Sequence, residues 1–456
     1  MTNARPCVAV IGGGASGALA ALALLGRPSG PDVIVVEPRA TLGHGVAYST
    51  SDQAHRLNVA AGMMSAFPAR PDHFVEWGAE RLPSFTAFSF APRALYGTYL
   101  TDTLHDAANG RLVHVQASAT SVRREGDGFA VQLDRGGSLR ADHVVLALGH
   151  ASAASLPVLE SGLGGDHAYA ADPWADEALR TLPRGTALLV GSGLTAVDVA
   201  LSLADRDPAA SIIALSRNGL RPLDHRSGGA AESPPVVSAL RPKTALGLLR
   251  AVRAEVALAA SQDGDWRDVV NRLRPTTQQI WQSLPAREKL RFQRRLARFW
   301  EVHRHRMAPE VAARIAELEQ EGRLRFVAGR VCSAERRGDR IEVVAELRGG
   351  HRIELATDAV VNCTGTQAGI RQHPLLARLE SAGLCAPGPL GLGVATDGSG
   401  RVLDRSGRAI GIYTLGPLRR GELWETTAVP EIRTQAFALA EHIAASYEPV
   451  TARAAI

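Results

Sequence analysis

The chain has 456 residues, 45% hydrophobic and 21% charged, so it is long enough for two or three globular domains and too apolar to be disordered. Its 51 basic residues only slightly outnumber its 46 acidic ones, and all basic residues except Lys243 and Lys289 are arginine. Because this small excess is dispersed along the chain, we expect no nucleic-acid partner.

The four cysteines, Cys7, Cys332, Cys363 and Cys385, are scattered without any close pair. This pattern argues against a zinc site and a redox dithiol, so we expect no metal and a reduced, cytoplasmic protein. No unbroken apolar run reaches the roughly 18 residues of a membrane span. The N-terminal apolar stretch is interrupted by glycines and lacks the cleavage site of a signal peptide.

The N-terminal segment predicts a dinucleotide-binding unit. A valine-rich strand at residues 7–11 precedes Gly12-x-Gly14-x-x-Gly17, and an alanine- and leucine-rich helix follows. The next strand, 33–36, ends at Glu37, 20 residues beyond Gly17, where an acid can accept hydrogen bonds from a ribose. A complete strand, turn, helix, strand and acid is much more specific than a glycine pattern alone.

Each glycine of this motif has a steric role. Gly12 allows the tight turn, Gly14 lets the backbone approach a pyrophosphate, and Gly17 lets the helix pack on the strand. We expect Gly13 to be less constrained. The predicted nucleotide ligands of this unit are Gly12, Gly14, Ala15, Ser16, Gly17 and Glu37.

A second copy follows the first in the same order. A strand at 187–190 leads into Gly191-x-Gly193-x-x-Ala196, a helix to about residue 203 and a strand at 212–215. In place of the acid stand a hydroxyl and a guanidinium, which favour a 2′-phosphate and hence NADPH over NADH. The predicted NADPH ligands are Gly191, Ser192, Gly193, Thr195, Ser216 and Arg217.

The internal repeat extends beyond these motifs. Residues 110–127 align with 322–339 at a constant offset of 212, and each segment leads through further strands to a turn, at Gly149 and Gly365 respectively, that we expect against a nucleotide. The predicted fold is α/β, with two nested Rossmann-like dinucleotide-binding domains and a helical insertion. We assign residues 1–165 and 367–456 to the first domain and 180–366 to the second, with the insertion at about 227–321.

Several segments resemble a known family. Residues 42–50, 55–77, 90–100, 216–225 and 422–436 resemble the bacterial FAD/NAD(P)-binding protein family of flavoproteins with two dinucleotide-binding domains. That family includes a flavin-dependent urate hydroxylase and is more distantly similar to N-hydroxylating flavin monooxygenases. The resemblance implies FAD in the first domain and NADPH in the second.

By the same resemblance, Asn58, Gly416, Thr426 and Thr427 are expected to contact the flavin, and the helix that begins near Pro430 points its N-terminus at the ring system. The chain departs from related enzymes in three respects. It lacks the cysteine pair of disulfide reductases and the FxGxxxHxxxW stretch of Baeyer-Villiger enzymes, and Pro417 follows Gly416 where an aspartate is usual.

With no dithiol to accept electrons from a flavin, the favoured function is an NADPH-dependent monooxygenase that uses molecular oxygen and a small nitrogen-containing substrate, by N-hydroxylation or by hydroxylation of a purine such as urate. The alternatives are a reductase with a separate acceptor and a non-catalytic flavin-binding redox sensor. No side chain is identified as catalytic; the candidates for positioning a substrate are Asn58, Arg93, His303 and Arg304. The competing interpretations are a loop asparagine, a surface arginine and a solvated arginine-rich helix face. The sequence indicates no oligomeric state.

Overall fold

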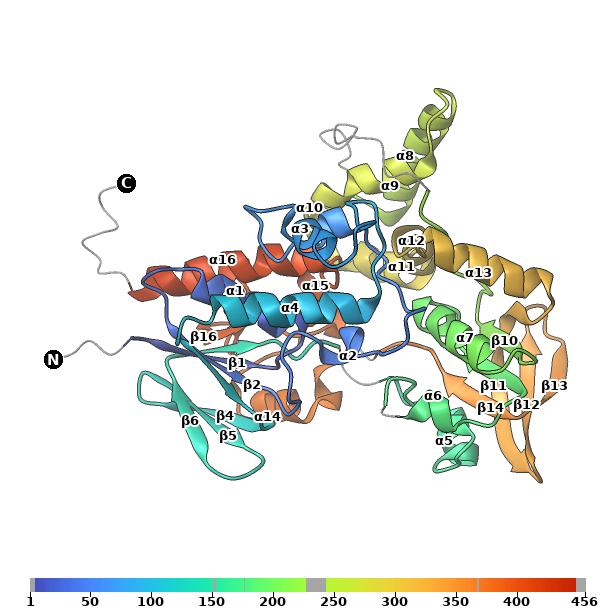
Figure 1. Ribbon diagram of the computed structural model, residues 1–456, viewed down its shortest axis with the longest axis horizontal. Helices are drawn as coiled ribbons and strands as arrows, with labels where there is room; N and C mark the ends of the chain where they lie inside the picture. Colours follow the sequence, from blue (N-terminus) through green and yellow to red (C-terminus); the bar gives the residue numbers. More distant parts are fainter. Residues whose placement is uncertain (1–4, 151–152, 176, 227–242, 367–368, 448–456) are drawn as a thin grey trace.

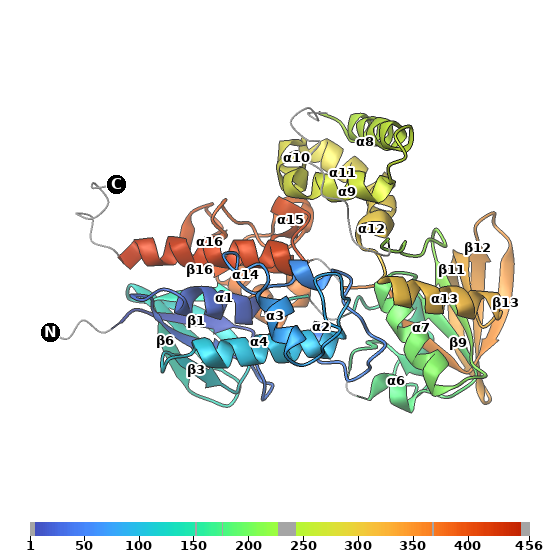
Figure 2. The same ribbon diagram turned by 45° about the horizontal axis from the view of Figure 1, so that its top comes forward.

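The computed structural model describes residues 5–150, 153–175, 177–226, 243–366 and 369–447. Two α/β lobes lie side by side, and a group of helices lies above their junction (Figures 1 and 2). This arrangement matches the predicted fold class. In the described ranges, no helix is both long and apolar enough to cross a lipid bilayer.

The first lobe is built on a six-stranded sheet with the order β15-β16-β7-β1-β2-β3. All neighbouring pairs are parallel except β15 with β16. Parallel central strands are buried on both faces, which explains the continuous apolar runs of the sequence. The strands are β1 (Cys7–Ile11), β2 (Asp32–Val36), β3 (Leu112–Val115), β7 (His143–Leu146), β15 (Arg401–Leu403) and β16 (Ala409–Thr414).

Alternate residues of β1 separate the two faces of this sheet. Val8 and Val10 pack under the helices α1 (Ala15–Leu25), α4 (Arg93–Ala107) and α16 (Val429–Tyr447). Ala9 and Ile11 pack on the opposite face, against a three-stranded meander and the helix α14 (Pro374–Ser381). The meander consists of β4 (Ala119–Glu125), β5 (Gly128–Leu133) and β6 (Ser138–Ala141), and three short helices lie in the loops: α2 (Gly45–Tyr48), η1 (Ala61–Met63) and α3 (His73–Ala79).

The second lobe contains a seven-stranded sheet with the order β13-β12-β11-β10-β9-β14-β8. Its helices α7 (Leu194–Arg206) and α13 (Pro309–Gln320) share one hydrophobic core, and α5 (Pro157–Leu163) packs on the other face. Two of the proposed boundaries therefore shift: α5 lies on the second sheet, and α13 belongs to the second lobe and not to the insertion. The strands are β8 (Tyr169–Ala170), β9 (Thr186–Val190), β10 (Ser211–Ser216), β11 (Leu324–Arg337), β12 (Arg340–Leu347), β13 (Arg352–Thr357) and β14 (Ala359–Asn362); the short helix α6 (Ala178–Thr181) precedes β9.

The repeat with an offset of 212 is visible in the backbone. Gly110 and Gly322 begin the repeated segments with φ of 70° and 71°, and Gly126 and Gly338 occupy the next turns with φ of 58° in both copies. A side chain rarely adopts these positive φ values, so the repeated glycines mark equivalent turns. In the second copy the two strands after the first turn merge into the single long strand β11.

The insertion contributes a group of helices that contacts both lobes (Figure 2). The indole of Trp281 in this group packs at a tilt against Trp424 of the first lobe, with ring centroids 4.7 Å apart. These helices are α8 (Ala245–Ala260), α9 (Trp266–Leu273), α10 (Thr277–Ser283), α11 (Ala286–Arg295) and α12 (Ala297–Arg304). The short helix α15 (Arg420–Leu423), from the C-terminal part of the first lobe, lies next to these helices in space.

Candidate functional site

The first glycine loop joins β1 to α1 through a tightly packed turn. Gly12 has a φ of 103°, and a Cβ atom there would collide with the carbonyl of Ala147. A Cβ on Gly17 would collide with the carbonyl of Gly12, so helix and strand approach closely. Gly14 caps α1 without any side-chain hydrogen bond, so the first N–H groups of the helix can bind an anion.

Glu37 lies buried at the end of β2 and faces this loop. Its carboxylate accepts a hydrogen bond from the Gly13 N–H at 2.8 Å and from the Arg39 N–H at 3.1 Å. A Cβ on Gly13 would lie only 2.7 Å from the Cβ of Glu37. The prediction that Gly13 is less constrained was therefore wrong, because Glu37 and Leu42 close in on it.

The C-terminal segment closes the other side of this loop. Gly416 has a φ of 70°, and a Cβ there would lie 3.1 Å from the Ser16 hydroxyl. The Gly416 N–H donates to the Gln435 side-chain oxygen at 2.9 Å, and the Thr426 hydroxyl donates to the Gly416 carbonyl at 2.9 Å. The Gln435 amide in turn donates to Thr426 at 2.8 Å. Gln435, which was not predicted from the sequence, thus holds the loop at Gly416, while Pro417 occupies the position at which an aspartate was expected.

Among the remaining predicted contacts near this loop, Ala15 lies half-buried in the first turn of α1, and Thr427 is half-buried before α16. Asn58 is half-buried, and its backbone carbonyl accepts a hydrogen bond from the His225 imidazole (Nε2–O 3.0 Å). Burial and the nearby Arg306 lower the pKa of His225 to about 4, so its imidazole is neutral at pH 7.

The second glycine loop repeats the first with different chemistry. Gly191 has a φ of 126°, and a Cβ there would collide with the carbonyl of Cys363. Gly193 caps α7 without a side-chain hydrogen bond, and a Cβ on it would meet no protein atom within 4 Å. Thr195 is half-buried in the first turn, and the Ser192 hydroxyl donates to Ser216 at 2.7 Å. Arg217 is exposed.

The turns that end the two repeats lie side by side. Gly149 and Gly365 have φ of 65° and 86°, and in both a Cβ would meet no atom within 4 Å. The Ala154 N–H donates to the Gly365 carbonyl at 3.0 Å, and the His150 imidazole lies 3.2 Å from the Thr366 hydroxyl. These two turns line a small cavity of about 30 Å³ together with residues near the Gly416 loop and α14. The residues that line it are Leu148, Gly149, His150, Thr366, Gly369, His373, Leu376, Gly393, Pro417, Leu418 and Arg420.

Arg93 connects the two lobes. Its guanidinium forms an ion pair with the Asp198 carboxylate of α7 (Nη2–Oδ2 2.7 Å), and the two side chains are 17% and 5% exposed. His55 of the first lobe also reaches α7, with Nε2 2.9 Å from the Ser202 hydroxyl. Arg93 is therefore not a plain surface residue, because its guanidinium pairs with Asp198 between the lobes.

A group of charged side chains joins α12 to the start of α16, and we call it the α12–α16 charge cluster. Arg304 lies 3.4 Å from the Glu425 carboxylate and 3.5 Å from the Glu431 carboxylate. His305, which the sequence analysis did not select, lies 2.8 Å from Glu301 and 3.7 Å from Glu425. The remaining member is Arg274, whose guanidinium bonds both oxygens of Glu431 at 2.6 and 2.8 Å.

His303, a predicted positioning residue, points away from this cluster. Its imidazole lies 2.7 Å from the carbonyl of Phe299 and packs against the Trp266 ring. Two residues along, His305 faces the opposite side, since residues separated by two positions do not share a helix face.

The cluster fixes several protonation states. Burial by itself would lower the pKa of His305, but hydrogen bonds and charge interactions with Glu301 and Glu425 raise it to about 9. Burial would raise the pKa of Glu425, but His305, Arg304 and Trp300 lower it to about 2. Burial, Arg420 and His305 lower the pKa of His150 to about 4. At pH 7, His305 is thus cationic, Glu425 anionic and His150 neutral.

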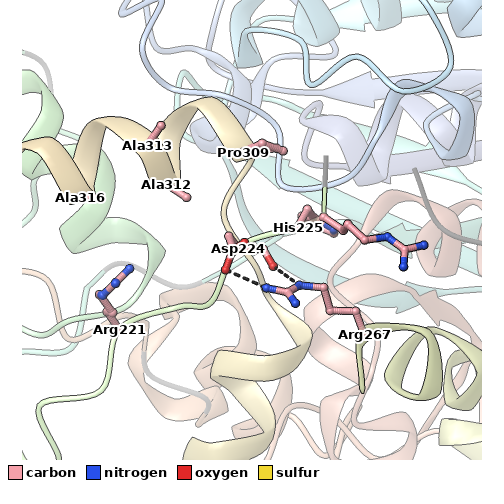
Figure 3. A pocket seen from close by; sticks show the side chains of 9 residues that line it. Arg221, Asp224, His225, Arg267, Pro309, Ala312, Ala313 and Ala316 are labelled. Atoms are coloured by element: carbon pink, nitrogen blue, oxygen red, sulfur yellow. Dashed lines mark hydrogen bonds and ion pairs between the residues drawn. The ribbon is translucent and has the colours of Figure 1, made fainter. Parts of the chain in front are cut away.

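A larger hollow, of about 540 Å³, lies between α13 and the segment after β10 (Figure 3). In it the Arg267 guanidinium donates to the carboxylate and the backbone oxygen of Asp224, at 2.9 and 2.8 Å. The hollow is lined by Arg221, Asp224, His225, Arg226, Arg267, Pro309, Ala312, Ala313 and Ala316.

Comparison with known proteins agrees with this geometry. A sequence model described as FAD-NAD(P)-binding matches residues 9–151. This part of the chain is therefore similar to FAD-NAD(P)-binding proteins. The family resemblance inferred from the sequence is confirmed for this segment. No curated protein sequence is significantly similar to the chain.

Solved structures share the fold of the whole chain at low identity. An L-lysine 6-monooxygenase from Pseudomonas syringae is 17% identical, with a TM-score of 0.68, and the alignment covers 97% of this chain and 100% of that one. An ornithine N-hydroxylase from Kutzneria sp. 744 is 18% identical, with a TM-score of 0.65 and the same coverage. A Lactococcus lactis thioredoxin reductase is 12% identical, with a TM-score of 0.55, and the alignment covers 97% and 98%.

The FAD-NAD(P)-binding segment has the features that a dinucleotide requires. Its tight glycine turn has no room for a Cβ at Gly12 or Gly17, and the uncapped start of α1 offers N–H donors. The Glu37 carboxylate lies where an acid would accept hydrogen bonds from a ribose, and the Gly416 loop lies against Ser16 on the other side. The residues present therefore fit the adenosine and pyrophosphate of a bound dinucleotide.

Proposed function

We propose that the chain is an FAD-dependent, NADPH-using monooxygenase that hydroxylates a small nitrogen-containing molecule. The observation that carries this proposal is the juxtaposition of the two nucleotide units. The turns at Gly149 and Gly365, one from each unit, are linked by hydrogen bonds and line one cavity with residues of the Gly416 loop. Two bound dinucleotides would then meet with their reactive ends near this junction.

In this arrangement the first site holds FAD and the second NADPH, and the flavin supplies hydride acceptance and oxygen activation. Gly12, Gly14, Ala15, Ser16, Gly17 and Glu37 would hold its adenosine and pyrophosphate. Asn58, Gly149, Gly416, Thr426 and Thr427 would lie along the rest of the molecule. The NADPH ligands would be Gly191, Ser192, Gly193, Thr195, Ser216, Arg217 and Gly365.

The role of the surrounding protein is to keep water out and to fix charge near the ring system. Trp424 and Glu425 are buried in the segment that precedes α16, whose N-terminal N–H groups and dipole favour negative charge. Around them, the α12–α16 charge cluster neutralises its own charges in pairs. These paired charges leave His150, neutral at pH 7, as a polar group at the junction of the two sites.

Two observations support oxygen as the electron acceptor. All four cysteines are free, and burial raises the pKa of the Cys363 thiol near the second site, so the chain offers no dithiol to pass electrons to a disulfide. The monooxygenases named above also share the fold with higher TM-scores than the thioredoxin reductase. Those neighbours act on amines, which supports a primary amine ahead of a purine. The reaction would convert amine, oxygen, NADPH and a proton into hydroxylamine, water and NADP⁺.

The proposal is tested with purified protein that retains yellow flavin absorbance. NADPH oxidation, oxygen uptake, hydroxylated product and hydrogen peroxide are measured with ornithine, lysine, cadaverine and urate. A monooxygenase couples oxygen uptake to product formation with at least one compound. Faster NADPH oxidation by a quinone under anaerobic conditions, without hydroxylated product, would instead identify a reductase. Bound flavin that NADPH does not reduce would identify a redox sensor.

The compartment is also part of the proposal. We propose a protein of the cytoplasm, where NADPH is available and where the free cysteines stay reduced.

A further inference from the structure

The second nucleotide loop differs from the first at the position that contacts the ribose. In the first copy the residue between the glycines, Gly13, donates its N–H to the acid Glu37. In the second copy the corresponding residues are Ser192 and Ser216, and their hydroxyls bond at 2.7 Å. The internal repeat therefore identifies this serine pair as the corner that faces the 2′ position of the adenosine ribose.

Arg298 of the helical insertion reaches into this corner. Its Nη2 donates to the Ser192 hydroxyl at 3.0 Å and to the Leu220 carbonyl at 3.0 Å. Burial lowers the pKa of Arg298, and the negative charge of Glu301 opposes this effect. The positive charge of Arg217, the residue after Ser216, lowers the pKa further, so Arg217 lies near Arg298. Two arginines from distant parts of the chain thus lie near one pair of serine hydroxyls.

Arg298 is half-buried, and no carboxylate of the described residues forms an ion pair with it. Arg304, on the same helix, pairs with Glu425 and Glu431, and Arg420 pairs with Glu301 at 2.9 Å. Placing one cation near another without a counter-ion is unfavourable. A dianion bound between the two guanidinium groups would remove that cost.

We propose that Arg298 binds the 2′-phosphate of NADPH together with Ser216 and Arg217, so that the insertion completes the second nucleotide site. This inference rests on the proposed function for the assignment of NADPH to that site. Its consequence is that α12 links the nucleotide to the α12–α16 charge cluster, since Arg298 and Arg304 lie on the same helix.

The test uses adenosine 2′,5′-bisphosphate and adenosine 5′-monophosphate, which differ only in the 2′-phosphate, as ligands of the FAD-loaded full chain in calorimetry. Arg298→Ala is expected to weaken bisphosphate binding about tenfold or more and monophosphate binding less than about twofold. Arg217→Ala should act in the same direction. Arg294→Ala is the matched control: it removes the same charge from an exposed position of α11 and should leave both affinities unchanged.

Arg298→Gln keeps an amide donor for Leu220 and serves as the second variant if the alanine variant does not fold. Equal weakening of both ligands, or no weakening, in Arg298 variants that retain flavin and a wild-type thermal midpoint would refute the role of Arg298. A wild-type protein that binds the two ligands equally well would instead refute the assignment of NADPH to the second site.

Discussion

Replacement of Arg93 tests whether the ion pair between the lobes stabilises the protein. The Asp198 carboxylate is 5% exposed in the wild type, and Arg93→Ala removes the guanidinium that lies 2.7 Å from it. A buried carboxylate without a partner is costly, and its pKa rises because the neutral form is favoured. Burial already raises the pKa of Asp198 in the wild type, against the opposing effect of Arg93.

The magnitude has a ceiling because Asp198 can take up a proton. An unfolded aspartate has a pKa of about 3.9, so protonating it at pH 7 costs about 4 kcal/mol, and at pH 5 about 1.5 kcal/mol. We expect Arg93→Ala to lose about 3 kcal/mol of unfolding free energy at pH 7. Since the folded variant binds the proton more readily than the unfolded chain, its stability rises as the pH falls. The deficit relative to wild type therefore shrinks toward pH 5.

Equilibrium urea unfolding followed by tryptophan fluorescence measures the deficit, since Trp174 contacts His55 beside this ion pair. Asp198→Asn added to Arg93→Ala should recover most of the loss, because the buried group is then neutral. Arg70→Ala, which breaks an exposed ion pair with Glu76, is the control and should cost less than about 1 kcal/mol. A deficit that is independent of pH, or no recovery with Asp198→Asn, would refute the reasoning.

Three further changes have distinct expected outcomes. Gly17→Ala places a Cβ against the Gly12 carbonyl, so we expect loss of flavin and a lower urea midpoint, measured by absorbance and unfolding. Gly193→Ala meets no protein atom within 4 Å, so it should keep the wild-type midpoint but bind NADPH about tenfold or more weakly in calorimetry. The pKa of His305 is raised to about 9, so protonated His305 stabilises the folded protein. For a side chain 27% exposed, we expect this contribution to the unfolding free energy to be about 2 kcal/mol. It is complete below about pH 6.5 and is lost as the pH rises through 9. In urea titrations, the stability gap between wild type and His305→Gln should close over that range; parallel curves would contradict it.

The nucleotide units could be predicted from the sequence because their geometry is local. The strand, the glycine turn and the helix follow one another within about 30 residues, and their steric constraints act between neighbours in the chain. The repeat offset of 212 similarly shows up as equal φ values at Gly126 and Gly338. Gly13 was misjudged because its constraint comes from the Glu37 side chain, and the sequence does not show how closely that side chain returns to the loop.

Contacts between segments that are distant in the chain could not be predicted from the sequence. Arg93 pairs with Asp198 on a helix of the other lobe, and no motif marks Asp198 as its partner. The sequence predicted His303 and Arg304 as positioning residues but did not indicate His305. Only the helix phase and the position of Glu425 decide which of these side chains lies in the cluster. Similarly, Gln435 holds the Gly416 loop across 19 residues of sequence.

These long-range contacts determine how the two nucleotide sites face each other. The polar links that join the parts include Arg93 with Asp198, His150 with Thr366, and Arg298 with Ser192. The first two connect the lobes directly, and the third ties the insertion to the second lobe, while Arg274 ties it to α16 of the first. Hydride transfer requires the donor and acceptor atoms within a few ångströms, a distance that each glycine loop alone cannot set. The chemistry would therefore depend on residues outside both nucleotide motifs, and a variant such as Arg93→Ala could retain both nucleotides and still lose their productive alignment.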